Sequence, residues 1–216
     1  MGRLSDRMQP FLRNRELSRL QGKILTAAQG RSVRSLFFTS PRSGDGKTTA
    51  AISTAYSLAT EGQVKVLLVD GNHAAPCLHR LFELPVGPGL VQFLAGEASL
   101  EQVVHATGHE NLRVMSHGAE NGLGITNMGS EKLKEEVAAL MASCDCVVLD
   151  GPGFFVSSDA ALLAPWFDAT LMVIQCERTK KAMIELLREN IHQVGGNLLG
   201  VVLNKRKYYI PRIFYG

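Results

Sequence analysis

The stretch at residues 40–50, SPRSGDGKTTA, holds residue types that could bind the phosphates of a nucleotide. Gly44 and Gly46 would let the backbone curl until several N–H groups face one anion. The Lys47 ammonium would reach the β and γ phosphates, and the Thr48 hydroxyl would bind Mg²⁺. The predicted nucleotide contacts are Ser43, Gly44, Asp45, Gly46, Lys47, Thr48 and Thr49. A glycine-rich turn without a ligand is the alternative interpretation of this stretch.

The residues around this loop favour the nucleotide interpretation. An apolar run precedes the loop and a helical pattern follows it, as phosphate binding at the start of a helix requires. The common phosphate-loop pattern GxxxxGK[ST] has glycine where this chain has Pro41. The sequence therefore predicts a variant of the phosphate-binding P-loop.

Three polar residues end apolar runs further along the chain. Asp70 ends VKVLLVD and Asp150 ends CDCVVLD, and an acid at the end of an apolar strand is the Walker B arrangement that holds Mg²⁺. We expect Asp150 to act on the metal through water. Asn204 ends GVVLN, and its amide could hydrogen-bond a nucleotide base. The alternative for all three is a polar residue that begins a turn.

The pattern of the whole chain predicts elements that would bring these residues together. Strands are expected at 33–39, 64–70, 112–116, 146–150, 171–174 and 199–204, and helices at 48–60, 131–143 and 179–194. Strands that are apolar almost throughout and alternate with helices indicate a parallel sheet covered on both faces. We therefore predict an α/β P-loop NTPase domain with helices on both faces, and its ligand at the carboxyl ends of the strands.

Length and composition indicate one globular domain with less regular ends. The chain has 216 residues, of which 45% are hydrophobic and 20% are charged. We divide it into a basic helical segment (1–30), the nucleotide-binding domain (31–204) and a basic tail with tyrosines (205–216). The net charge of +3 is too small to suggest a nucleic-acid partner. Four cysteines without CxxC spacing favour a reduced cytosolic protein without structural zinc.

Several segments together resemble the bacterial tyrosine kinases of capsule and exopolysaccharide synthesis, from about Glu16 to the end of the chain. These segments are SPRSGDGKTTAAISTAYSLA, VLLVDGNHAAPCLHRLFEL, CDCVVLDGPGF, SSDAALLA and LLGVVLNKRKYYIP. The resemblance implies ATP and Mg²⁺ as cofactors, phosphorylation of tail tyrosines within a homo-oligomer, and a membrane-spanning activator. No spanning segment is evident in the sequence, so we expect the activator to be a separate protein that recruits this one to the inner face of the membrane.

The resemblance also assigns roles to residues. Lys47 and Thr48 match the phosphate lysine and the magnesium hydroxyl, and Asp150 matches the Walker B acid. Asp70 matches the first acid of the family's second Walker motif, and we expect it to be the proton acceptor. The remaining assignments are the oligomer contacts Glu16 and Arg19, from an ExxRxxR motif whose third position is Gly22 here, and the phosphoacceptors Tyr208, Tyr209 and Tyr215. The alternatives for the tail tyrosines are packing on the domain or a partner; the basic tail could also contact anionic lipid.

Two departures from the family pattern leave other functions open. Asn72 stands where the family has a second acid, which predicts weaker Mg²⁺ retention and slower phosphoryl transfer. Our first interpretation is an ATP-dependent protein-tyrosine autokinase of polysaccharide production. The alternative is an ATP-binding switch of the same machinery, which Asn72 and Gly22 favour. A third possibility, a partition or division ATPase, draws on Arg42, which stands where those ATPases have a lysine that reaches the partner's phosphates.

Overall fold

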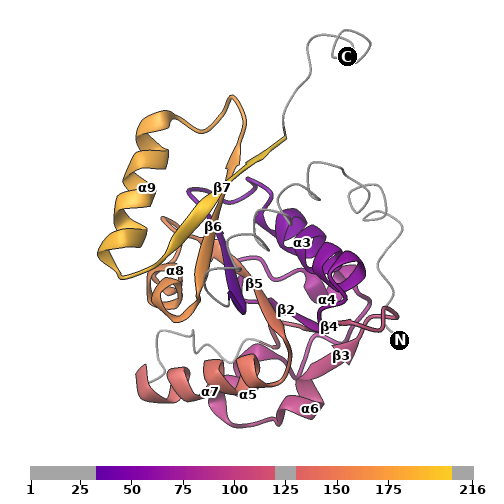
Figure 1. Cartoon of the computed structure of the whole chain (residues 1–216). Coiled ribbons are helices and arrows are strands. Elements are labelled where there is room, and N and C mark those ends of the chain that lie inside the picture. The colour runs from indigo at the N-terminus through magenta and orange to yellow at the C-terminus, as the bar shows by residue number, and fades with distance from the viewer. Residues whose placement is uncertain (1–32, 120–129, 206–216) are drawn as a thin grey trace, which may run out of the picture.

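A computed structural model of the chain describes residues 33–119 and 130–205 and contains one seven-stranded sheet (Figure 1). The strand order is β3-β4-β2-β5-β1-β6-β7, and every neighbouring pair is parallel except β3 and β4. The strands are β1 (Ser35–Ser40), β2 (Val66–Asp70), β3 (Val104–Ala106), β4 (Leu112–Met115), β5 (Cys146–Gly153), β6 (Ala169–Gln175) and β7 (Leu198–Asn204). The residues predicted as oligomer contacts and phosphoacceptors lie outside the described residues: Glu16, Arg19, Tyr208, Tyr209 and Tyr215.

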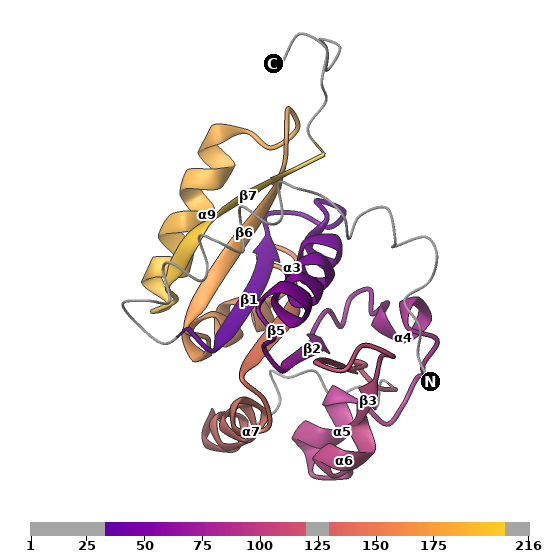
Figure 2. The ribbon, with the colours of Figure 1, turned by 45° about the vertical axis from the view of Figure 1, so that its right-hand side comes forward.

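Helices cover both faces of the sheet, as predicted (Figures 1 and 2). One face packs against α3 (Lys47–Glu61) and α4 (Leu78–Leu81). The other packs against α5 (Leu90–Ala95), α6 (Leu100–Val103), α7 (Ser130–Ala142), α8 (Ser158–Leu163) and α9 (Lys181–Gln193). A short 3₁₀ helix, Ala164–Trp166, follows α8. The prediction of an α/β domain with helices on both faces is therefore confirmed.

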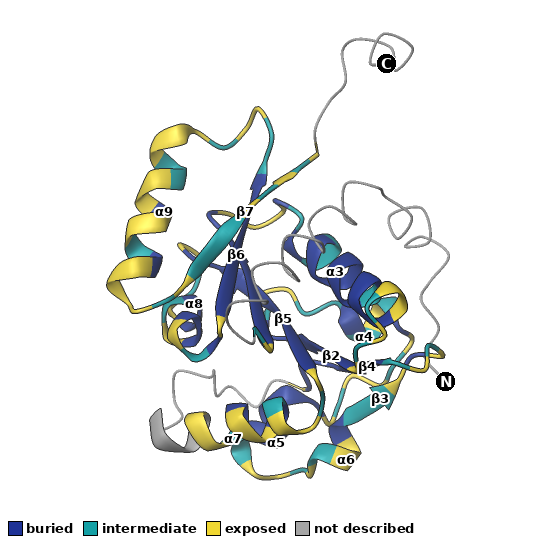
Figure 3. Cartoon of the chain, viewed as in Figure 1, coloured by how far each residue is buried: buried dark blue, intermediate teal, exposed yellow. Residues whose placement is uncertain are grey.

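The central strands are apolar on both sides because each side meets a layer of helices. In β1, Phe37 packs toward α5, α7 and α8, while its neighbours Leu36 and Phe38 pack toward α3. Every residue of β1, β2 and β5 is buried, and Figure 3 shows these strands in dark blue. The side of α3 that meets the sheet is rich in alanine, which allows the helix to lie close to the strands.

Strand pairing brings the carboxyl ends of β1, β2 and β5 to one edge of the sheet. β5 lies between β2 and β1, and Asp70 at the end of β2 is in register with Asp150 in β5. β1 ends at Ser40 and α3 begins at Lys47, so the predicted phosphate loop occupies the same edge. The two acids and the loop therefore meet, although Asp150 lies 80 residues after Asp70 in the sequence.

Candidate nucleotide-binding site

The loop between β1 and α3 is held in a curled path by its own backbone and side chains. Gly44 and Gly46 have φ angles of +84° and +99°, a region that side chains other than glycine rarely adopt. The carboxylate of Asp45 is buried and accepts a hydrogen bond of 3.2 Å from the backbone N–H of Arg42. Ser43 and Gly44 remain exposed at the rim. Both glycines thus adopt a backbone conformation that lets the loop curl, and convergence of its N–H groups on an anion stays a prediction.

Lys47, the first residue of α3, is buried, with only 5% of its surface exposed. Burial lowers the pKa of its ammonium, and the negative charges of Asp150 and Asp45 oppose that shift. A buried cation of this kind needs an anion close by to be favourable. The phosphates of a nucleotide would supply that charge.

Thr48 and Asp150 form a short polar contact in the site. The Thr48 hydroxyl donates a hydrogen bond of 2.5 Å to Oδ2 of Asp150. Burial raises the pKa of Asp150 to about 7; the nearby Asp70 also raises it, while the Thr48 hydrogen bond and Lys47 lower it. The other oxygen, Oδ1, is buried and has no hydrogen-bond partner among the described residues. An unsatisfied carboxylate oxygen beside a hydroxyl fits Mg²⁺, which prefers oxygen ligands.

Asp70 organises the loop that follows β2. Its Oδ2 accepts hydrogen bonds from the backbone N–H groups of Cys77 (2.8 Å) and Leu78 (2.9 Å), and its Oδ1 accepts one from Asn72 (3.2 Å). Burial raises the pKa of this carboxyl, and those hydrogen bonds partly oppose the rise. Both oxygens are therefore engaged by the backbone. The role of Asp70 as proton acceptor stays a prediction.

Asn204 lies directly against the phosphate loop. Its side-chain amide donates a hydrogen bond of 2.9 Å to the carbonyl of Asp45, and the ammonium of Lys205 donates one of 2.7 Å to the carbonyl of Gly44. A Cβ atom placed on Gly46 would lie 1.8 Å from Nδ2 of Asn204. The end of β7 therefore braces the loop, and contact of Asn204 with a nucleotide base stays a prediction.

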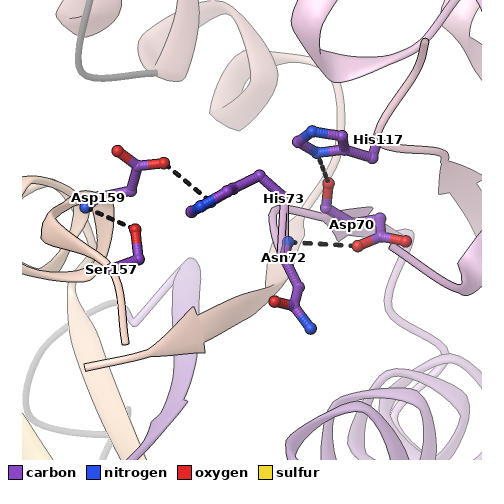
Figure 4. Close-up of polar contacts among 6 residues, drawn as sticks. All are labelled: Asp70, Asn72, His73, His117, Ser157 and Asp159. Atoms are coloured by element: carbon purple, nitrogen blue, oxygen red, sulfur yellow. Dashed lines mark hydrogen bonds and ion pairs between the residues drawn. The ribbon is translucent and has the colours of Figure 1, made fainter. Parts of the chain in front are cut away.

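The structure adds four residues that the sequence prediction did not include. The Cys77 thiol lies 3.8 Å from the Thr48 hydroxyl, and Nδ1 of the buried His117 lies 3.3 Å from the carbonyl of Asp70. Nδ1 of His73 lies 3.0 Å from Oδ2 of Asp159 (Figure 4). His117 closely follows the end of β4, so the strand-end rule that indicated Asp70 could have indicated it too.

Other features lie away from this site or at its margin. Arg42 is an exposed residue of the loop, and the side-chain amide of Asn72 donates a hydrogen bond of 3.4 Å to the carbonyl of Ala75. A cavity of about 420 Å³ lies at the opposite edge of the sheet, where Lys65, Arg113 and Cys144 contribute to its lining. It contains none of the predicted site residues.

All four cysteines are free thiols, and no helix within 33–119 and 130–205 is long and apolar enough to cross a membrane.

Comparison with known proteins identifies the family of this chain. A family model described as an AAA domain matches residues 34–199. The tyrosine-protein kinase CpsD of Streptococcus pneumoniae serotype 4 is 30% identical over 177 residues, which cover 82% of this chain and 78% of that protein. The chain belongs to the bacterial tyrosine-protein kinase family.

Solved structures place this family member among the P-loop ATPases. The chimeric protein CapA2B2 has a TM-score of 0.82 at 27% identity, covering 89% of this chain and 84% of that one. The septum site-determining protein MinD of Pyrococcus horikoshii, solved with Mg-ADP, has a TM-score of 0.66 at 25% identity and covers 84% and 75%. The resemblance stated from the sequence is confirmed, and family membership implies nucleotide binding.

Proposed function

We propose that this protein is an ATP-dependent tyrosine kinase that phosphorylates its own chain and regulates the production and export of extracellular or capsular polysaccharide. The observation that carries the proposal is the contact of Thr48 with Asp150 beside a buried Lys47, next to a loop with two glycines at positive φ. Membership in the tyrosine-protein kinase family supports tyrosine as the acceptor.

The phosphates of ATP would be held by the N–H groups of residues 43–49, with the positive end of α3 behind them. Lys47 would pair with the β and γ phosphates. Thr48 would bind Mg²⁺ directly and Asp150 would hold it through water, with the Thr48 hydroxyl still donating to Asp150. When bound, Mg²⁺ would neutralise the negative charge that develops between the two phosphates.

Family membership supports the proposed acceptor and partners, and the residues assigned to them lie outside the described residues. Tail tyrosines Tyr208, Tyr209 and Tyr215 would be phosphorylated by a neighbouring subunit, with Glu16 and Arg19 at the subunit contact. Phosphorylation adds between 1.5 and 2 negative charges to a tail that is otherwise basic, so it would alter whatever the tail contacts. The protein would work in the cytoplasm, recruited to the inner face of the membrane by a membrane-spanning activator.

A second candidate is a nucleotide-dependent switch of the same machinery. Asn72 supports it, because an uncharged amide can neither hold Mg²⁺ strongly nor take a proton. A division-type ATPase is a more distant third possibility, which Arg42 and the likeness to MinD support. Replacing Asn72 by Asp separates the first two: a large gain in phosphotyrosine indicates a weakened kinase, and no gain favours the switch.

The direct test is mass spectrometry of the protein purified from its own host, where its activator is present. The wild type is compared with Lys47→Met, which removes the buried ammonium. Tail phosphotyrosine in the wild type and its loss in Lys47→Met support the kinase. Absence of phosphotyrosine from both, together with assembly that depends on ATP, supports the switch.

A further inference from the structure

The end of β7 holds two consecutive peptide groups of the phosphate loop. The side-chain amide of Asn204 donates a hydrogen bond of 2.9 Å to the carbonyl of Asp45. The next residue, Lys205, donates one of 2.7 Å from its ammonium to the carbonyl of Gly44. Two neighbouring residues at one strand end therefore bond to the peptide group that joins Gly44 to Asp45 and to the one that joins Asp45 to Gly46.

The strand end that carries these donors is itself fixed. The backbone carbonyl of Asn204 accepts a hydrogen bond of 2.9 Å from the N–H of Cys176, which directly follows β6. The Oδ1 atom of Asn204 accepts another of 2.9 Å from the N–H of Lys205. Lys205 has a φ of +55°, a value that residues other than glycine keep only where their surroundings hold them. Both donors are thus presented to the phosphate loop from a fixed turn.

Holding a carbonyl also sets the direction of the N–H group in the same peptide unit. In a planar trans peptide, the C=O and the N–H point in opposite directions. The N–H groups opposite the two held carbonyls belong to Asp45 and Gly46, so both point away from the end of β7. Within residues 33–119 and 130–205, neither of them donates to another backbone group.

The φ angles of the loop fit a backbone that binds an anion. Gly44 and Gly46 have φ angles of +84° and +99°, and the φ of Asp45 between them is negative. Backbone that alternates in this way is the arrangement of anion-binding nests, in which successive N–H groups face one concave side. The hydrogen bonds from Asn204 and Lys205 hold the two peptide groups at the centre of this alternation.

We propose that Asn204 and Lys205 are positioning residues for phosphate binding, which hold the loop carbonyls so that the N–H groups of Asp45 and Gly46 face the phosphates. The proposal rests on the proposed binding of ATP at this loop. The positive charge of Lys205 also polarises the peptide group that it bonds, which makes the N–H of Asp45 a stronger donor. The ligand that this arrangement recognises is a chain of phosphates, whatever group the chain carries.

This role of Asn204 differs from the base contact that the sequence predicts. A base contact would use the Nδ2 and Oδ1 atoms of the side chain. Nδ2 donates to the Asp45 carbonyl and Oδ1 accepts from the N–H of Lys205, so both atoms have partners in the protein. A polyphosphate without a base therefore separates the two roles.

The test compares the binding of Mg-ATP and of inorganic tripolyphosphate with Mg²⁺ to the full-length protein by isothermal titration. At about 0.5 M salt the screening length is roughly 4 Å, so the loss of a distant charge has little effect. We expect Lys205→Met and Asn204→Ala each to lower the affinity for both ligands about tenfold, within the range of one lost hydrogen bond. Lys205→Arg keeps a cationic donor and should bind both ligands more tightly than Lys205→Met. The control Lys180→Met removes an exposed lysine that precedes α9 and should match the wild type.

A second measurement reports the loop itself in the nucleotide-free protein. A hydrogen bond to a carbonyl polarises its peptide group, so its loss should shift the NMR signal of the amide nitrogen in that group. Lys205→Met should shift the amide signal of Asp45, and Asn204→Ala should shift that of Gly46. Lys180→Met should shift neither signal.

The remaining outcomes separate this proposal from the nucleotide site itself. Unchanged affinities in Lys205→Met and Asn204→Ala would overturn the proposal and leave nucleotide binding intact. A loss for ATP but not for tripolyphosphate in Asn204→Ala would assign Asn204 to the base and overturn its positioning role. Weaker binding by Lys205→Met with an unchanged Asp45 signal would overturn the role of Lys205, because its ammonium would then act on the phosphates directly.

Two further results keep the test decisive. Lys205 is exposed, so Lys205→Met carries the test alone if Asn204→Ala does not fold. A wild type that binds neither ligand, or whose affinities Lys47→Met leaves unchanged, would overturn the proposed nucleotide site together with this role of β7.

Discussion

The Thr48 hydroxyl donates a hydrogen bond of 2.5 Å to a carboxylate oxygen of Asp150, which lies 102 residues later in the chain. This contact joins the first turn of α3 to Asp150 within the central strand β5, which continues to Gly153. It leaves the second oxygen of Asp150 buried without a hydrogen-bond partner among the described residues. A single hydrogen bond thus joins the phosphate loop to the site that we expect to hold Mg²⁺.

Replacing Thr48 by Val should remove this hydrogen bond with little change in side-chain volume. We expect the free energy of unfolding to fall by about 1–3 kcal/mol, because the buried Asp150 loses its donor. Affinity for Mg-ATP should fall at least tenfold, and affinity for ATP in EDTA should change much less. Isothermal titration with and without Mg²⁺ measures both affinities.

The matched control for Thr48→Val is Thr54→Val in the same helix. The Thr54 hydroxyl is buried and has no hydrogen-bond partner among the described residues, so its removal should cost no stability and leave Mg-ATP binding unchanged. Equal losses of Mg-ATP affinity in the two variants would mean that the Thr48 hydroxyl has no special role.

Replacing Gly46 by Ala should weaken both folding and ATP binding. The positive φ alone costs an alanine about 1–2 kcal/mol. A further loss is expected because the new methyl group would meet Nδ2 of Asn204. Gly108→Ala is the control, since Gly108 has a φ of +82° but open space around its Cβ position.

A double variant isolates the contact with Asn204. Gly46→Ala combined with Asn204→Ala should recover the part of the loss that exceeds Gly108→Ala, as measured by urea unfolding. Equal destabilisation by Gly46→Ala and Gly108→Ala would show that Asn204 does not brace the phosphate loop in solution.

The stability of the nucleotide-free protein should fall as pH rises from about 4 to about 7. Burial raises the folded-state pKa of Asp150 to about 7, whereas the unfolded carboxyl titrates near its ordinary value of 3.8. Between these values the unfolded chain binds fewer protons than the folded one, so the free energy of unfolding decreases with pH. The slope approaches about 1.4 kcal/mol per pH unit for one group. Burial also raises the pKa of Asp70, which acts in the same direction.

Urea unfolding at several pH values tests this dependence in the wild type and in Asp150→Asn. The amide has no proton to lose, so the variant should keep only the shallower slope that Asp70 contributes. An identical slope in the two proteins would assign the effect to other groups.

The fold was predictable from sequence because its strands are buried on both faces. The runs that became β1, β2 and β5 are almost wholly apolar, which is how a parallel strand between two helical layers must be composed. β3 was missed because it has only three residues, Val104–Ala106, and lies antiparallel at the sheet edge where no long apolar run is needed. The short helices α4 and α6 have four residues each, too few for a visible helical period.

The residues of the site at strand ends were predictable from the sequence, whereas contacts that depend on the paths of loops were not. The sequence predicts Thr48 and Asp150 at one site because a parallel sheet collects the carboxyl ends of its strands at one edge. The backbone N–H groups of Cys77 and Leu78 donate hydrogen bonds to the Asp70 carboxylate. These bonds depend on the path of a loop, which the hydrophobic pattern of the sequence does not predict. The same holds for the contact of His73 with Asp159 and for Asn204 against Gly46.

A crystal structure with Mg²⁺ and a non-hydrolysable ATP analogue tests the central claim most directly. We predict the triphosphate against the backbone N–H groups of residues 43–49, with Mg²⁺ about 2.1 Å from the Thr48 hydroxyl oxygen. The contact from Thr48 to Asp150 should persist. A triphosphate bound elsewhere while this loop stays free, or a metal ion that touches neither Thr48 nor the waters around Asp150, would contradict the account.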